Sequence, residues 1–439
     1  MKNRRFLFLW ALLIAASTVL GGCAMTVDQM YRLPRRSERY EALQTQMDAA
    51  MNGMRYSAPV SGENRQTVQM ADLDGDGLSE IVAFVKGEDA DPLKILIFTP
   101  AGDGFELRHT LQSTGMEFDQ VEYAQMDGQP GLELIVGRQV GDQVLRNVSV
   151  YSFSGGNERL LLSTNYQKML ICDLDVDGAK DLFVIHPGQQ EDEHGVAALY
   201  SVHGGEVIRS AEADLSVSAD SLKRIITGSL DSGESAVYVV GKAGEEAILT
   251  DVFALVDGNL KNITLSTEAG TSVQTLRNYY VYADDLDADG VVELPELITM
   301  VQPMARTGNT SRHLIRWYSL RSDGSSVTKR FTYHSYPDGW YIELDESVSR
   351  DIWVDLDTSG GHRFHLFDPE RGTSKLLFTI YTMTGEQRMN VAQQDELQEI
   401  YKTDNVVYAA YVAEDSPVGI EDLRQHFRLI RVYWNTGEM

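Results

Sequence analysis

The chain has 439 residues, of which 43% are hydrophobic, and this is enough for two or three domains with real cores. Its 65 acidic and 38 basic side chains give a formal net charge of −27. This acidity argues against a nucleic-acid partner, because nucleic acid requires a basic protein surface.

Residues 1–22 have the features of a bacterial lipoprotein signal peptide. Three of the first five residues are basic, and an apolar run covers residues 6–20. The run ends in Leu20-Gly21-Gly22-Cys23, which is similar to the bacterial lipobox, where cleavage precedes a cysteine that then receives a lipid such as palmitate. The alternative is an uncleaved transmembrane anchor, for which the run is short. We expect an extracytoplasmic protein, anchored to the bacterial cell membrane by lipid on Cys23.

Residues 23–65 are expected to form a tether and an amphipathic helix. Four arginines between residues 32 and 39 lie close to the anchor, where they either attract anionic lipid headgroups or solvate the start of the helix. Apolar residues at three- and four-residue spacing, including Leu43 and Met47, predict a helix from Ser37 to Met51 that packs on the main body.

From Thr67 onward the pattern changes to short strands separated by turn residues. We expect strands at Val68–Ala71, Glu80–Val85, Leu93–Phe98 and Phe105–Leu111. The first two flank a loop that begins Asp72-Leu73-Asp74-Gly75-Asp76-Gly77. One unit therefore has about four strands and one aspartate loop.

The aspartate loop has the composition of a calcium site. Its aspartates stand at alternate positions with an acid, Glu80, at the ninth, and similar loops begin at Asp173 and Asp285. Alternate carboxylates on a tight loop can direct hard oxygen ligands at one ion. The competing interpretation is a turn stabilised by aspartate and glycine without an ion. We favour calcium, because three crowded carboxylates without a cation would repel one another.

Two weaker copies of the loop reveal a repeat. They begin at residues 125 and 229, so the five loop starts fall at intervals of 53, 48, 56 and 56 residues. A regular period of about 50 residues in a strand-rich chain indicates a repeat architecture. Four strands per unit favour a β-propeller, here with five detectable blades.

The aspartate loops, each followed by an apolar strand, resemble the FG-GAP and VCBS repeats of integrin-like β-propellers. The resemblance covers residues 66–335 and implies a calcium-binding propeller. Carried over position by position, it implies three calcium sites. Their ligands would be Asp72, Asp74, Asp76 and Glu80 in the first loop, Asp173, Asp175, Asp177 and Asp181 in the second, and Asp285, Asp287, Asp289 and Glu293 in the third. The loops at residues 125 and 229 depart from the pattern, so we assign them no metal.

The sequence pattern of residues 336–439 differs from that of the repeats. Strand-like stretches alternate there with two stretches that look helical or partly so, Val391–Tyr401 and Gly419–His426. This mixture favours a separate C-terminal α+β domain. The alternative is that these residues form further degenerate blades that complete the ring.

Catalytic patterns are scarce. His362 and His365 lie in a strand-like stretch without the neighbouring glutamate of a zinc protease, and no nucleophile elbow or phosphate-binding glycine loop occurs. We therefore expect a cell-surface binding or scaffolding module for a protein or glycan ligand rather than an enzyme. Two alternatives remain: an envelope hydrolase of polysaccharide or phospholipid that uses the propeller as a platform, and a lipoprotein that senses calcium itself.

Overall fold

The computed structural model describes residues 38–102, 104–141, 145–188, 193–279, 281–300, 312–392 and 396–431. The expected signal peptide at 1–22, the lipidated Cys23 and most of the tether lie outside the described residues. Among the residues that are described, no helix has the length and apolar character needed to cross a membrane.

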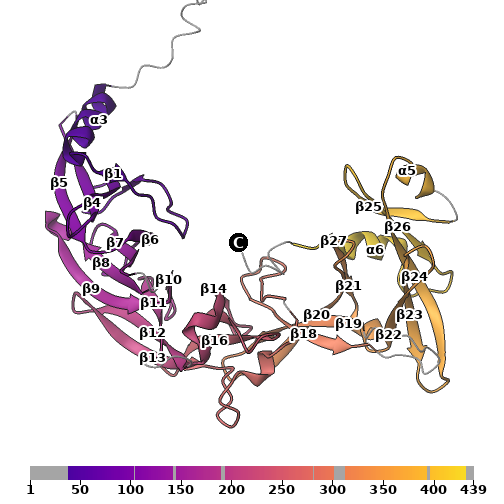
Figure 1. The fold of residues 1–439 in the computed structure, drawn as a ribbon. Coiled ribbons are helices and arrows are strands. Elements are labelled where there is room, and N and C mark those ends of the chain that lie inside the picture. The colour runs from indigo at the N-terminus through magenta and orange to yellow at the C-terminus, as the bar shows by residue number, and fades with distance from the viewer. Residues whose placement is uncertain are drawn as a thin grey trace, which may run out of the picture. The chain divides into compact units, whose positions relative to one another are not determined.

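The described chain is mainly β and contains six antiparallel sheets, which we number in chain order (Figure 1). Sheet 1 contains β1 (Arg55–Tyr56), β2 (Val68–Ala71), β3 (Glu80–Lys86), β4 (Leu93–Ala101) and β5 (Gly104–Ser113). Sheet 2 contains β6 (Glu117–Ala124), β7 (Glu133–Gln139), β8 (Arg146–Ser152) and β9 (Arg159–Tyr166). Sheet 3 contains β10 (Lys168–Cys172), β11 (Asp181–His186), β12 (His194–His203) and β13 (Glu206–Ser218).

The remaining three sheets follow the same antiparallel plan. Sheet 4 contains β14 (Leu222–Ser229), β15 (Ser235–Lys242), β16 (Ile248–Val256) and β17 (Asn259–Asn262). Sheet 5 contains β18 (Leu294–Thr299), β19 (His313–Leu320), β20 (Ser326–Ser335), β21 (Trp340–Leu344) and β27 (Phe427–Leu429). Sheet 6 contains β22 (Ile352–Leu356), β23 (His362–Asp368), β24 (Thr373–Met383), β26 (Val407–Val412) and β25 (Gln398–Lys402).

The described helices are few and mostly short. The α-helices are α3 (Glu38–Met51), α4 (Glu346–Ser349), α5 (Arg388–Val391) and α6 (Ile420–His426). The 3-10 helices are η1 (Ser154–Gly156), η2 (Ala219–Ser221) and η3 (Val273–Thr275).

Contacts divide the chain into two compact units, of which the first contains α3 and sheet 1. The apolar stripe of α3 places Leu43 and Met47 against Ile81, Leu96 and Phe98 of the sheet. Burial of each such side chain contributes about 1.5–3 kcal/mol relative to leaving it exposed. The prediction of a docked helix from about Ser37 to Met51 is confirmed by α3.

The second unit contains residues 58–66, 72–77 and the chain from 114 onward, and its sheets pack on one another through shared cores. β11 shows how the sequence produces this arrangement. Successive strand residues point to opposite faces. Leu182 and Val184 therefore enter the core shared with sheet 2, while Phe183 and Ile185 enter the core shared with sheet 4. A strand buried on both faces requires the continuous apolar run that the chain has here.

The four strands expected in the first unit of the repeat are confirmed by β2 to β5, with small differences at their ends. Two expectations for the C-terminal part are wrong. The stretch expected to be helical at 391–401 contains the strand β25, because pairing with β26 buries Ile400 and overrides helix propensity. The expected boundary at residue 335 does not separate two sheets, since β21 pairs with β20 and completes sheet 5.

Candidate metal centres

The loops that begin at residues 72, 125 and 173 connect β2 to β3, β6 to β7 and β10 to β11, and the loop that begins at residue 285 directly precedes β18. The residue before the first loop position pairs with the residue at the ninth: Ala71 with Glu80, Ala124 with Glu133, Cys172 with Asp181 and Asp284 with Glu293. Because this register recurs, the acid at the ninth position lies at the start of the strand that follows the loop or, for Glu293, directly before it. The sequence spacing of eight residues therefore corresponds to one local structure.

The second residue of the loop is an apolar side chain that enters the core in four of the loops, where Leu73, Met126, Leu174 and Leu230 are all at most 3% exposed. In the third complete loop the corresponding Leu286 is only partly buried. The loop therefore contributes to the core whether or not it carries a full set of aspartates.

The fourth acid has a structural role of its own. Glu293 accepts a hydrogen bond from the backbone N–H of Leu286 at 3.0 Å, and Asp181 accepts one from Leu174 at 3.4 Å. Glu133 makes the same bond with the N–H of Met126 at 2.8 Å, although its loop has lost two aspartates. The acid at the ninth position thus closes the loop by accepting the N–H of the second.

The loops also need residues in the left-handed backbone region. At the fourth position φ is +77° for Gly75, +69° for Gly128, +58° for Val176 and +61° for Ala288. Glycine adopts this region without steric cost, whereas a β-branched residue such as valine is strained there. The second loop therefore stores strain at Val176.

Aspartate carboxylates accept hydrogen bonds from backbone N–H groups that have no backbone partner in the tight turn. Asp285 accepts hydrogen bonds from the N–H groups of Asp289 at 3.1 Å and Gly290 at 2.9 Å. Asp175 accepts one from the N–H of Asp177 at 3.2 Å. These are the aspartate-stabilised turns of the competing interpretation, and they leave other oxygens and lone pairs available for an ion.

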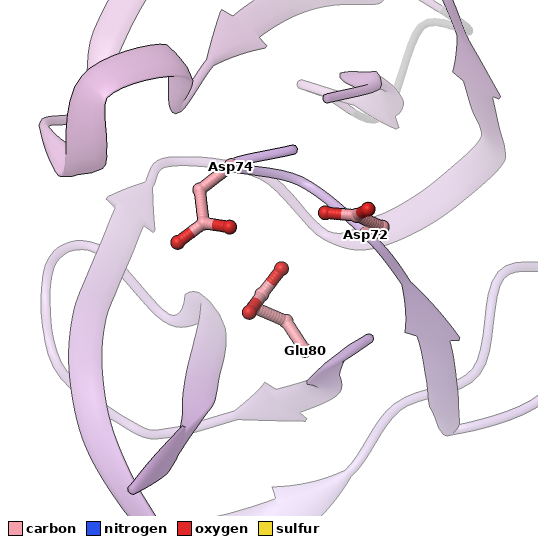
Figure 2. A group of neighbouring side chains, drawn as sticks. All are labelled: Asp72, Asp74 and Glu80. Carbon is pink, nitrogen blue, oxygen red and sulfur yellow. The ribbon is translucent and has the colours of Figure 1, made fainter. Parts of the chain in front are cut away.

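Three clusters of carboxylates result, one in each complete loop. They comprise Asp72, Asp74 and Glu80; Asp173, Asp175 and Asp177; and Asp285, Asp287 and Asp289. In each cluster, one oxygen per residue lies within 4.8 Å of the others. Figure 2 shows the first cluster, in which the carboxylates face one another across a small space.

The structure brings together three of the four acids predicted for each loop. Asp76 lies outside the first cluster and is exposed, while Asp181 and Glu293 lie outside the second and third and are buried. Burial raises the pKa of Asp181, and it raises the pKa of Glu293 to about 7, with a further contribution from the charges of Asp287 and Asp289.

The clusters have the dimensions and chemistry that calcium requires. Oxygens that coordinate one calcium ion at 2.3–2.6 Å lie at most about 5 Å apart, which agrees with the 4.8 Å limit of the clusters. Asp173 Oδ1 is buried and has no hydrogen-bond partner among the described residues, and Glu293 Oε1, near the third cluster, is in the same state. An orphaned buried carboxylate oxygen is costly unless a cation or a proton satisfies it. The residues present therefore fit calcium.

Protein cations contact the aspartates of the incomplete loops. In the loop at 125, Arg159 Nη2 lies 3.7 Å from Asp127 Oδ2. In the loop at 229, Lys329 Nζ lies 2.8 Å from Asp231 Oδ1 and Arg321 Nε lies 3.3 Å from Oδ2. The hydrogen bond from Lys329 is the main reason that the pKa of Asp231 lies below its ordinary value.

The second complete loop differs from these. Within the described residues, no lysine or arginine nitrogen lies within 4.0 Å of the carboxylates of Asp173, Asp175 or Asp177. The third loop is intermediate, because Arg330 contacts Asp287. Aspartates without a protein cation are the ones that need an external one.

Sequence reasoning missed a sixth loop. Asp355 and Leu356 end β22, and Asp357 begins the turn to β23, the next strand of sheet 6. The register is shifted by one residue from that of the other loops, because Asp355 itself pairs with Arg363 at the ninth position. Asp355 forms a bidentate pair with Arg363, with distances of 2.9 and 2.7 Å, and Asp357 accepts the N–H groups of Ser359 and Gly361. The repeated Asp-Leu-Asp triplet was the signal that could have revealed it.

Comparisons with known proteins add little to this description. No protein-family model matches the chain, and no curated protein matches it significantly. Among solved structures, the rhamnogalacturonan lyase YesW is 15% identical with a TM-score of 0.32, and the match covers 72% of this chain and 54% of the lyase, so this chain spans about half of its length.

Two further structures are similarly distant. A protein from Lactobacillus plantarum is 10% identical with a TM-score of 0.29, and the match covers 72% of this chain and 85% of that one. A rhamnogalacturonan lyase from Bacillus licheniformis is 11% identical with a TM-score of 0.27, covering 74% and 72%. TM-scores this low carry no argument about activity or ligand. Fold and loops define a mainly β protein built from repeated antiparallel sheets with acidic hairpin loops.

Proposed function

We propose that this chain is an extracytoplasmic bacterial lipoprotein of the FG-GAP/VCBS type, anchored through lipid on Cys23, in which calcium stabilises propeller-like blades. Its function is to bind or scaffold a protein or glycan ligand at the cell envelope. The observation that carries the proposal is the recurrence of an ion-sized acidic cluster in three loops that share one backbone register. Repeated sheets then present loops from several blades, a common way to build a binding surface.

The alternative of an envelope hydrolase would need two or three acids, or a serine and a histidine in a nucleophile–base arrangement, that converge in one cleft. Ser335 and His362 do meet, with Oγ 3.3 Å from Nε2. Asp338 binds the same nitrogen at 3.0 Å, and Tyr333 binds Nδ1 at 2.9 Å. In a catalytic triad, the serine and the carboxylate bind opposite ring nitrogens. Since Ser335 is also 2% exposed, this cluster supports packing between sheets 5 and 6, and we favour the binding role.

A calcium count with a melting curve tests the metal. We expect about three ions per chain and a large fall in melting temperature when EGTA removes them, because the clustered carboxylates then repel one another. The absence of bound calcium, together with an unchanged melting curve, would leave the loops as aspartate-stabilised turns and remove the main support for the proposal.

The anchor has a separate test. Cells that express the full chain are labelled with a clickable palmitate analogue, and we expect the label on the wild type but not on Cys23→Ser. A Cys172→Ser variant is the matched control, because Cys172 is buried in the described core and should not affect labelling. Label on Cys23→Ser would contradict the assignment of the lipid.

A further inference from the structure

Two adjoining cavities lie on sheet 5 beside the third aspartate loop. The smaller has a volume of about 370 Å³ and is lined by Asp287 of the loop, by Arg330 and Glu343 of the sheet, and by residues of the segment 425–431. The larger has a volume of about 580 Å³ and lies against α4 and α6. Arg330, Glu343 and His426 line both cavities, so they form the wall between them.

Arginine side chains are concentrated in the smaller cavity of an otherwise acidic protein. Arg330, Arg428 and Arg431 line it together with Asp287 and Glu343, and Arg431 Nη1 lies 3.2 Å from Asp284 Oδ2. Arg428 is exposed, and its Nη1 donates to a backbone carbonyl at 2.8 Å. No carboxylate of the described residues lies within 4.0 Å of its guanidinium. In a chain with a net charge of −27, such a concentration of arginine needs a reason.

Arg330 connects this cavity to the third loop. Its Nη1 lies 3.2 Å from Glu343 Oε1, and its Nη2 contacts Asp287 Oδ2. Its Nε is buried and has no hydrogen-bond partner among the described residues. The guanidinium is therefore not fully hydrogen-bonded, and its charge is balanced in part by a carboxylate that belongs to a cluster of calcium-site dimensions.

A calcium ion in the third loop would compete with Arg330 for the carboxylate of Asp287. When Asp287 coordinates an ion in the third loop, its charge is shared with that ion and it balances Arg330 less well. The field in the cavity then becomes more positive. A guanidinium that loses a carboxylate partner favours a replacement oxyanion, because its planar donors match carboxylate and phosphate groups bidentately.

We propose that the smaller cavity binds a small ligand with a carboxylate or phosphate group, and that calcium in the third loop strengthens this binding through Asp287 and Arg330. This inference rests on the calcium part of the proposed function. The cavity volume lies near the lower end of the range for ligand pockets, about 300–1,000 Å³, and suits a single acidic sugar or a short phosphate ester.

The test is isothermal titration calorimetry on the purified full chain with glucuronate, methyl phosphate and glucose, each in calcium and in EGTA. We expect at least one of the two oxyanions to bind in calcium, glucose not to bind, and EGTA to weaken the binding severalfold. Whichever oxyanion binds more tightly identifies the carboxylate or the phosphate as the recognised group.

Four variants locate the site. Arg330→Gln and Arg428→Gln should each weaken oxyanion binding about tenfold, the usual effect of losing a charge-assisted hydrogen bond. Arg371→Gln is the matched control. Arg371 is an exposed arginine in a turn of sheet 6 and does not line the smaller cavity. Asp287→Asn should bind the oxyanion in EGTA at least as well as the wild type does in calcium, since it frees Arg330 permanently. A purely structural role for Asp287 predicts a loss instead.

The outcomes separate this inference from the proposed function. Bound calcium without oxyanion binding overturns the inference and leaves the proposed function intact. Equal oxyanion affinity in calcium and EGTA overturns the coupling, and a chain that binds no calcium overturns both the coupling and the metal part of the proposed function. If Arg330→Gln fails to fold, Arg428→Gln and Asp287→Asn still decide the matter.

Discussion

The carboxylate of Asp231 binds the ammonium group of Lys329 at 2.8 Å, in a loop that stands where other sheets carry a full set of aspartates. A side chain from sheet 5 thus provides the positive charge in this loop. Where a lysine or arginine is already in contact, an aspartate loop has less need of an ion.

Replacing Lys329 with methionine should therefore destabilise the protein to the same extent in calcium and in EGTA. The expected loss is about 1 kcal/mol, because the pair is only partly shielded from solvent. Urea unfolding in both buffers measures it. A loss that appears only in EGTA would show that calcium replaces the lysine, and would contradict the assignment of a protein cation to this loop.

Removing one aspartate of the second cluster should remove one calcium ion. Asp175→Asn is expected to lower the calcium count from about three to about two, because the cluster loses one of its carboxylates. In EGTA the variant should melt no lower than the wild type, since crowding of like charges is reduced. The matched control is Asp127→Asn, in a loop without a cluster, which should leave the calcium count unchanged.

Glycine at position 176 should stabilise the second loop. Val176 has φ of +58° and is 68% exposed, so its side chain contributes strain and little packing. Val176→Gly should raise the free energy of unfolding by about 0.5–1 kcal/mol, the left-handed penalty less the extra freedom of glycine in the unfolded chain. Val291→Gly is the comparison. Val291 does not have a positive φ, so the same change there should lower the stability of the protein.

His334 should make the fold sensitive to acid. Burial lowers its pKa from 6.5 to about 3. Below about pH 6.5 this histidine is therefore protonated in the unfolded chain, whereas in the folded chain it stays neutral until about pH 3. Stability from this residue is fully present above pH 6.5 and falls by about 1.4 kcal/mol per pH unit as the pH decreases through this window.

The contribution of His334 is measured as a difference between variants. Free energies of unfolding at pH 4.5 to 7 should show a smaller decline for His334→Gln than for the wild type. His203→Gln, at an exposed histidine, should keep the wild-type slope. Identical slopes for all three proteins would contradict the assignment of a neutral buried imidazole.

The loop-and-strand unit could be predicted from the sequence because its determinants are local. The spacing from Asp72 to Glu80 specifies a turn, a register and the start of a strand within nine residues. The sequence could not show whether the fourth acid is a metal ligand or a hydrogen-bond acceptor. A carboxylate at position 293 can serve either purpose, and in the structure Glu293 accepts the N–H of Leu286.

Features that depend on contacts between residues far apart in the chain could not be predicted from the sequence. The contact of Lys329 with Asp231 joins residues of different sheets, and nothing in the local pattern near Lys329 indicates it. The loop at Asp355 was missed for a related reason. Its third aspartate has been lost, and Arg363, which holds Asp355, lies on the strand that follows. The strand β27 pairs with β21, although all the strands of sheet 6 lie between them in the sequence. The local sequence therefore could not predict the partner of β27.

That pairing of β27 with β21 has a consequence for how the C-terminal part comes apart. The chain leaves sheet 5 after Leu344, builds sheet 6, and returns to sheet 5 at Phe427. Sheet 6 is thus an excursion clamped at both ends to one strand pair. A protease that cuts once inside the excursion leaves two fragments that still share hydrogen bonds, so a nicked molecule remains assembled until sheet 5 itself opens.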